Sequence, residues 1–447
     1  MNQPGLQRTL LLICLLVTGG LLTAQNLTRH EFTVQQAIDY ARKNNAQVKN
    51  ALLSVQIQKQ SNRGVTAAAL PNISGTMGLT DYIDIPTSLI PGEIFGQPAG
   101  TYIPVKFGTK YNASAGLQLQ QVLFDGQVFV GLQARATSID YQVKSAEITE
   151  ETIKTNIYKI YYQLVVSKTQ IDLLDANIDR LKKLEHDTKE LYKNGFAEKL
   201  DLDKISVQIT NLHTEKAKAQ NNINIGYLGL KTLLGMPVKD SLILLDNISE
   251  SQIKDDLTKD TAYQYSDRKD FQYLGLVKKL NEYNIKRYQL SYLPSLSLTG
   301  SYSKNAQRNQ FDFGGGNWFT TSYIGVNLSV PIFSGFAKDA KVKQSRLELK
   351  QTENQLDQLK LSIDNDVEQA KINFSSAITT MTYQKKNMEL AETVYSQTRK
   401  KFEIGTGSNT EITAAQTDLI TAQTNYINAL YSAIIARIDY LKAIGKI

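Results

Sequence analysis

The sequence predicts an α+β membrane protein built from two copies of one structural unit. Three observations lead to this prediction: short segments whose hydrophobicity has a period of two, long proline-free segments with a period of seven, and a set of motifs that occurs twice in the same order. A period of two is typical of strands with one apolar face, and a sustained period of seven is typical of coiled-coil helices. The sequence of 447 residues therefore does not predict the two or three globular domains that such a length usually suggests.

Residues 1–24 have the composition of a secretory signal peptide. Arg8 supplies the basic start, residues 10–22 are apolar, and Thr23–Ala24 offers small residues for cleavage. An apolar run of about 13 residues is short for a membrane-spanning helix, which needs roughly 20, so a signal anchor is the less favoured alternative. The single cysteine, Cys14, lies inside this run without the small residue expected before a lipidated cysteine, so lipoprotein processing is not favoured. We expect an exported mature chain without disulfides.

An internal duplication follows, with a period of about 210 residues. Its motifs recur in order: Leu70–Pro71 and Leu293–Pro294, Leu123–Gly126 and Ile332–Gly335, Gly195 and Gly405, Gly235 and Gly445. This period is far longer than the unit of a solenoid, so it indicates two copies of one large supersecondary unit. We expect a first repeat over 25–237, a linker over 238–266 and a second repeat over 267–447.

Each repeat is expected to contribute two strands after an opening helix. Apolar and polar residues alternate over 111–123 and again over 320–332. Their partner strands, about 72–82 and 295–304, start directly after the Leu-Pro pairs, because proline ends the preceding helix. The segment 83–110, rich in proline and glycine, is expected to be a long loop between the first two strands.

Each repeat is also expected to contain a long helix followed by a shorter one. No proline interrupts the heptads of 126–193 and 336–403, which amount to about 100 Å of helix each. The following helices are predicted over 199–234 and 409–445. Taken alone, the heptads would favour an ordinary long coiled coil without a tube.

Four amphipathic strands cannot close a sheet in a membrane, because open edges leave backbone groups unpaired in lipid. The smallest closed membrane sheets have eight strands, so a ring of two or three chains is the direct solution. The motif Phe124, Asp125 and Gly126 and its copy Phe333, Ser334 and Gly335 would then mark the inner membrane boundary. An aromatic belt would mark the outer one, formed by Phe311, Phe313, Trp318, Phe319 and Tyr323.

In the order of these motifs the chain resembles the TolC-like outer-membrane efflux protein (outer-membrane factor) family. The resemblance covers nearly the whole mature chain and includes the entry helix from Phe32, the Leu-Pro pairs, the motifs before the long helices and the glycines that follow the helices. It implies a homotrimer in which each protomer gives four strands to a 12-stranded outer-membrane β-barrel. A long periplasmic α-helical coiled-coil barrel would continue that barrel.

The resemblance further implies the outer-membrane exit channel of a tripartite efflux pump or a type I secretion system. Such a channel passively conducts small molecules or polypeptides, and its partners are a periplasmic adaptor (membrane fusion protein), an inner-membrane transporter and outer-membrane lipid. Its location would be the outer membrane of a Gram-negative-type bacterium, with a large periplasmic part. The alternative is a periplasmic or surface structural coiled-coil protein without a pore.

Two groups of site residues follow from the resemblance. The turns between the helices would dock the adaptor, through Gly195, Phe196, Ala197, Gly405 and Thr406. Acidic residues just after these turns would form the periplasmic gate: Glu411, Asp201 and Asp203. Where the family pattern has a second acid, this chain has Ala414, which puts the inner gate in doubt. The alternative interpretations are a helix cap with an exposed apolar residue, and the usual preference for acids in the first turn of a helix.

No enzymatic chemistry is expected. The sequence has no GxSxG, P-loop or HExxH motif, and His30, His186 and His213 lie far apart, so no catalytic, cofactor or metal site is predicted. The formal charge of +7 comes from lysines interleaved with acids, which favours a solvated surface over a nucleic-acid partner.

Overall fold

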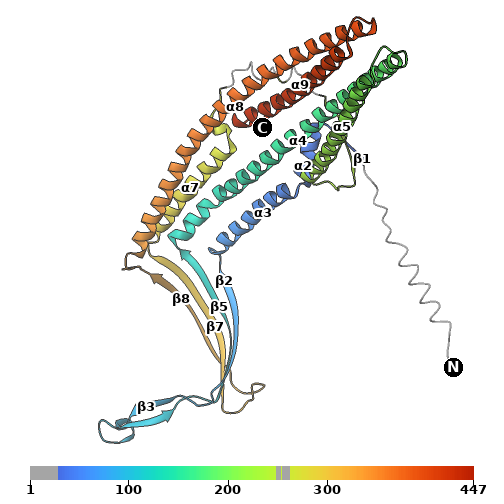
Figure 1. The fold of residues 1–447 in the computed structure, drawn as a ribbon. Helices are drawn as coiled ribbons and strands as arrows, with labels where there is room; N and C mark the ends of the chain where they lie inside the picture. Colours follow the sequence, from blue (N-terminus) through green and yellow to red (C-terminus); the bar gives the residue numbers. More distant parts are fainter. Residues whose placement is uncertain (1–28, 248–252, 254–261) are drawn as a thin grey trace, which may run out of the picture. The chain divides into compact units, whose positions relative to one another are not determined.

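The computed structural model describes residues 29–247, 253 and 262–447 (Figure 1). The predicted signal peptide, 1–24, and part of the predicted linker lie outside the described residues. Within the described ranges, no helix combines the length and the apolar character needed to cross a membrane.

The chain forms two compact units, which we call the helical unit and the strand unit. The helical unit contains the described residues of 1–51, 147–268 and 363–447, and the strand unit contains 52–146 and 269–362. Each unit takes segments from both predicted repeats. The compact units therefore do not coincide with the sequence repeats, and each copy of the repeat completes its packing with the other.

The strand unit contains a four-stranded antiparallel sheet in the order β2-β5-β7-β8 (Figure 1). Its strands are β2 (Asn72–Asp81), β5 (Tyr111–Phe124), β7 (Ser295–Arg308) and β8 (Phe319–Ser329). The central β5–β7 pair joins the two repeats and contains one irregularity, between Val122 and Phe124. The outer edges of β2 and β8 have no strand partner within the described chain.

The sheet has one apolar and one polar face, because residues paired across strands share a face. Ile73 pairs with Leu119, which pairs with Gly300, and Gly300 pairs with Ile324. The neighbouring row runs through Ser74, Gln118, Ser301 and Tyr323. Ile73, Ile324, Val326 and Leu328 are all exposed, so the apolar face is uncovered in the single chain.

Three details of the strands differ from the sequence prediction. The strand predicted over 320–332 ends at Ser329, because Pro331 cannot donate to a ladder. The strand predicted to end near 304 continues to Arg308. The predicted loop 83–110 contains a hairpin of β3 (Thr87–Pro91) and β4 (Tyr102–Lys106), joined through the 3-10 turn η1 (Gly92–Phe95).

Four helices lie wholly or in part in the strand unit with the sheet: α3 (Ala46–Ala67), α4 (Gly126–Lys193), α7 (Lys269–Leu290) and α8 (Ala337–Glu403). Neighbours are joined by polar contacts between α3 and α4 (Asn62 Nδ2 to the Arg135 carbonyl, 2.7 Å), between α4 and α7 (Tyr141 and Tyr273 hydroxyls, 2.6 Å) and between α7 and α8 (Lys278 and Glu353, 3.2 Å).

The helical unit is built from two helical hairpins. One pairs α4 with α5 (Lys199–Leu234), and the other pairs α8 with α9 (Asn409–Ala443) (Figure 1). One apolar core joins both hairpins and includes Leu181, Ile205, Tyr395, Ile412 and Leu419. A second core, around Ile157, Tyr161 and Leu230, is covered by α2 (Val34–Asn44).

The linker region holds structure that the sequence prediction missed. Within the segment expected as a polar linker, β6 (Ser241–Leu244) pairs in parallel with β1 (Arg29–Phe32), and η2 (Tyr265–Asp267) precedes α7. The opening helix of the first repeat is also divided, because the chain is extended at Asn45 between α2 and α3.

The four repeated glycines have one conformation. Gly195, Gly235, Gly405 and Gly445 have φ angles of 78°, 71°, 77° and 75°, the left-handed region that glycine adopts without strain. At Gly235 a Cβ atom would lie 2.5 Å from the Asn44 carbonyl oxygen, so space as well as backbone angle requires glycine. The duplicated motif thus corresponds to the same helix end in both repeats.

Candidate functional site: the groove between the hairpin tips

The tips of the two hairpins of the helical unit border one groove of about 700 Å³. The first tip contributes the end of α4 and the turn into α5, and the second contributes the end of α8 and the turn into α9. Apolar side chains from both tips line the groove, namely Leu191, Phe196 and Phe402. Each tip therefore supplies part of a surface that neither forms alone.

Both tip turns end their helices with the same hydrogen bonds. The Phe196 amide donates to the Leu191 carbonyl over 2.8 Å, and the Thr406 amide donates to the Lys401 carbonyl over 2.9 Å. Together with the left-handed glycine before each, these bonds form the motif that satisfies the last carbonyls of a helix. The turn leaves Phe196 81% exposed. An apolar ring is thus fixed at the groove by a hydrogen-bonded backbone turn.

Three of the five predicted docking residues line this groove. Gly195 lies in the turn beside it, and Phe196, Ala197 and Gly405 line it. Thr406 lies in the second turn but is not among the lining residues. Several lining residues were not predicted, among them Asp187, Glu190, Phe402 and Glu403.

Two of the predicted gate acids cap helices. Glu411 accepts a hydrogen bond from the Ser408 amide (3.3 Å), and the Glu411 amide donates to the Ser408 hydroxyl (3.2 Å). Asp201 accepts from the Glu198 amide over 3.3 Å. Such reciprocal bonds satisfy backbone donors at the start of a helix. Glu411 and Asp201 therefore have a structural role of their own, whatever else their charges do.

The gate residues do not converge in the single chain. Asp201 lines the tip groove, whereas Asp203, Glu411 and Ala414 do not and are exposed. Any ring of these acids would have to be completed by further copies of the chain.

The groove is rimmed by acids. Asp187, Glu190, Asp201 and Glu403 all line it, and no lysine or arginine does. Lys193 donates to Glu190 over 2.7 Å and thereby lowers the pKa of that carboxyl, and Arg399 pairs with Glu403 at 2.9 Å. An apolar floor with an acidic rim can bind a protein segment that carries apolar and basic side chains.

Two buried polar atoms in the groove wall lack partners. Neither the Thr188 hydroxyl nor the Asn409 side-chain oxygen has a hydrogen-bond partner in the described structure. Thr188 is fully buried. Among the described residues no cluster of histidine, cysteine and acidic side chains could hold a metal ion.

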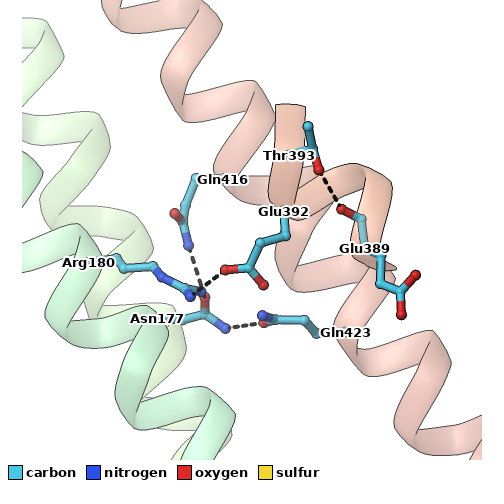
Figure 2. A network of polar contacts seen from close by, with 7 residues as sticks. All are labelled: Asn177, Arg180, Glu389, Glu392, Thr393, Gln416 and Gln423. Atoms are coloured by element: carbon cyan, nitrogen blue, oxygen red, sulfur yellow. Dashed lines mark hydrogen bonds and ion pairs between the residues drawn. The ribbon is translucent and has the colours of Figure 1, made fainter. Parts of the chain in front are cut away.

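A buried polar network connects the two hairpins away from the tips, as Figure 2 shows. The Asn177 amide on α4 donates to Gln423 on α9 over 2.7 Å and accepts from Gln416 over 3.1 Å. Beside it Arg180 pairs with Glu392 of α8 at 3.0 Å. Sequence reasoning missed this network, although Asn409, Gln416 and Gln423 recur every seven residues in an otherwise apolar seam.

The predicted inner-boundary motifs lie in the strand unit where strands give way to helices. Asp125 accepts from the Gln127 amide over 2.7 Å and so caps α4. Gly126 is required because a Cβ atom would lie 2.7 Å from the Leu290 side chain. In the second copy Ser334 precedes Gly335, whose φ is 59°. The rings of Phe124 and Phe333 each lie 5.6 Å from a second phenylalanine, Phe129 and Phe336 respectively.

The predicted aromatic belt lies at the turn between β7 and β8. Ring contacts run from Phe311 to Phe313 (5.6 Å) and from Phe313 to Trp318 (6.4 Å). Phe319 and Tyr323 are exposed on β8, but both lie on the polar face of the sheet, opposite Ile324 and Val326, so their rings do not extend the apolar face as the prediction of a belt requires. The structure thus separates the aromatic cluster and the boundary motifs along the strands.

Comparisons with known proteins agree with this architecture. A family model described as "Outer membrane efflux protein" matches residues 269–446. Outer membrane protein TolC of Vibrio cholerae is 22% identical over 343 residues, which covers 75% of this chain and 77% of that protein. Outer membrane efflux protein BepC of Brucella suis is 21% identical over 444 residues, 98% of this chain and 90% of its own length.

Among solved structures, the outer membrane protein VceC from Vibrio cholerae has a similar fold. The TM-score is 0.71 at 13% identity, and the match covers 92% of this chain and 96% of that one. The similarity of fold therefore extends over both repeats.

Proposed function

We propose that the chain is a TolC-like outer-membrane efflux protein with a large periplasmic part, and that it is the exit channel of an export system. In this role it assembles as a homotrimer, contributes four strands per protomer to a 12-stranded barrel, and conducts small molecules or polypeptides without doing chemistry on them. The tip groove docks a periplasmic adaptor that connects the channel to an inner-membrane transporter.

One observation carries the proposal: the four-stranded sheet is open at both edges and apolar on one exposed face. A single chain cannot satisfy those edges in lipid, whereas a ring of copies pairs β2 of one protomer with β8 of the next. The apolar face is then covered by lipid and the polar face lines water.

Conductance tests the channel directly. Detergent-purified full-length protein, added to a planar lipid bilayer, is expected to give discrete conductance steps. The rival function, a structural coiled-coil protein, predicts a chain that is soluble without detergent and makes no pores. That outcome would reject the channel.

Docking at the tips is tested with Phe196. Phe196→Asp adds one more acid to an already acidic groove and removes its exposed apolar ring, so binding of the adaptor from the same bacterium should fall at least about tenfold, or 1.4 kcal/mol. The matched control is Ile404→Asp, which changes an exposed apolar residue of the other tip that does not line the groove. Equal losses in both variants, measured by co-purification and size-exclusion chromatography, would count against the groove.

A further inference from the structure

The two repeats enter their long helices differently. In the first repeat β5 ends at Phe124 and α4 begins at Gly126. In the second, β8 ends at Ser329 and α8 begins only at Ala337. The connection between them includes Phe336, with a φ of 64°, the one non-glycine residue in the described chain with a left-handed backbone. A side chain in this region clashes with its own backbone, so the conformation is unfavourable for phenylalanine.

The strained residue is not held there by packing within the chain. Phe336 is 73% exposed, and its neighbour Phe333 is 78% exposed at 5.6 Å between ring centroids. Strain of this kind persists where a function requires it. Two uncovered aromatic rings thus follow the end of a strand that has an apolar face.

Two cations lie at the end of α7, and one of them, Lys338, follows this aromatic pair in the sequence. Lys338, two residues after Phe336, has its Nζ 5.7 Å from the Tyr292 ring centroid and donates to the Ser291 carbonyl over 2.6 Å. Arg287, one helical turn before Ser291, lies 4.9 Å from the ring of Tyr288. Neither cation has a carboxylate partner within the described residues, whereas nearby Asp339 is paired with Lys343.

The succession of an apolar strand face, exposed aromatic rings and cations corresponds to the succession of acyl chains and headgroups at the surface of a bilayer. Aromatic rings are favoured where acyl chains meet headgroups, and lysine or arginine beside them reaches the phosphates. Basic pockets between helices just outside the membrane bind anionic headgroups for the same reason. Beyond Lys338 the start of α8 continues with Lys341, Lys343 and Arg346, so the surrounding potential is positive.

We propose that the β8–α8 connection and the end of α7 form a binding site for an anionic phospholipid. Phe333 and Phe336 contact the upper acyl chain, and Lys338 and Arg287 bind the headgroup phosphate. This proposal depends on the proposed outer-membrane location. It adds to that function a defined place on the chain where lipids are selected by the charge of their headgroup.

Lipid retention tests the site in the full-length protein. Native mass spectrometry of the detergent-purified protein, titrated with phosphatidylglycerol or phosphatidylethanolamine, should show phosphatidylglycerol binding at least about tenfold tighter. Arg287→Gln combined with Lys338→Gln should abolish this preference, while the side-chain amide introduced in place of Lys338 can still donate to the Ser291 carbonyl. The matched control is Lys110→Gln, since Lys110 also lies over a tyrosine, 5.2 Å from Tyr111, before the start of β5. Equal binding of both lipids, or an equal loss in the control, would overturn the proposal.

Phe336→Gly separates lipid contact from packing. Glycine suits the left-handed backbone, so the thermal unfolding temperature should stay the same or rise, while phosphatidylglycerol binding weakens several-fold. A lower unfolding temperature with unchanged lipid binding would show that the ring serves packing and would overturn its assignment. Conductance of the same samples keeps the two proposals apart: pores without lipid preference reject only the lipid site, and lipid preference without pores rejects only the channel.

Discussion

Tyr161 shows how one buried side chain can join three segments. Its hydroxyl donates to the Phe32 carbonyl over 2.8 Å and accepts from the Asp246 amide over 3.2 Å. It thereby connects α4 to the end of β1 and to the segment after β6. Burial raises the pKa of Tyr161 from 10.0 to about 12, because the ionised phenolate would lose its hydration.

Tyr161→Phe should destabilise the protein by about 1–3 kcal/mol at pH 8, because it leaves the Asp246 amide without a partner. It also removes one of two donors to the Phe32 carbonyl, which keeps the Leu245 amide at 3.0 Å. The raised pKa favours the neutral phenol in the folded state, so this stabilisation is complete below pH 10 and is lost as the pH rises from 10 through about 12. The gap in thermal unfolding temperature between wild type and variant should therefore narrow above pH 10. The control is Tyr383→Phe, at a tyrosine that is 69% exposed. A gap that stays constant well above pH 10 would contradict the prediction.

At the scale of elements, the polar network around Asn177 fixes how one hairpin lies on the other. Apolar heptads can slide by one repeat with little loss, whereas a buried hydrogen-bonded amide matches only one register. Asn177, Gln416 and Gln423 are at most 3% exposed, so misalignment would leave them unpaired in an apolar interface. The network therefore specifies the pairing of α4 with α9.

A double-mutant cycle tests this specification. Asn177→Leu and Gln423→Leu should each cost about 1–3 kcal/mol, because each leaves a buried amide unpaired. The double variant should cost less than the sum of the two, since the Asn177–Gln423 hydrogen bond is then removed from both sides, and only Gln416 is left without its Asn177 acceptor. Urea denaturation followed by circular dichroism measures these costs, and Asn224→Leu, at an exposed amide of α5, provides the control. Strict additivity would show that the two amides act independently.

For the whole molecule, the central question is what the acids near the tips do in the assembly. Glu411 caps α9 in this chain, and three copies would place three such carboxylates around one axis. Charge in a narrow mouth selects ions, whereas a cap acts only on its own helix.

Glu411→Gln separates the two roles, because glutamine preserves a capping box while it removes the charge. Helix content and thermal stability should be unchanged, and the reversal potential in a potassium chloride gradient across a planar bilayer should shift toward lower cation selectivity. Glu215→Gln, at an exposed ion-paired acid of α5, should leave selectivity as it was. If Glu411→Gln has no effect on selectivity either, the acid is a cap alone.

The sequence predicted the elements better than their contacts. Hydrophobic periodicity and the glycines at helix ends are local features of the sequence. Gly126, Gly195 and Gly405 therefore predicted the ends of the long helices closely. The strands β1 and β6 and those of the β3–β4 hairpin were missed because they are short. So few residues do not show a recognisable alternation of apolar and polar side chains. The comparisons confirm the resemblance to TolC-like proteins.

The tip groove and the network depended on which helix faces meet. Asn177 and Gln423 are 246 residues apart, and no local pattern pairs them. Phe196 could be predicted from its glycine turn, but Phe402 and Asp187 could not, because only the approach of the second hairpin brings them to the same surface.

The mixed composition of the two compact units has an evolutionary consequence. Each unit is completed by segments from both repeats, through the β5–β7 ladder in one and the α4–α9 contacts in the other. A half-length ancestor would have needed a second copy of itself to bury the same surfaces. Gene fusion would have converted an association between molecules into one within a single chain and freed the halves to diverge. Phe336, with its left-handed backbone, and its counterpart Gln127, which lies inside α4, differ in this way.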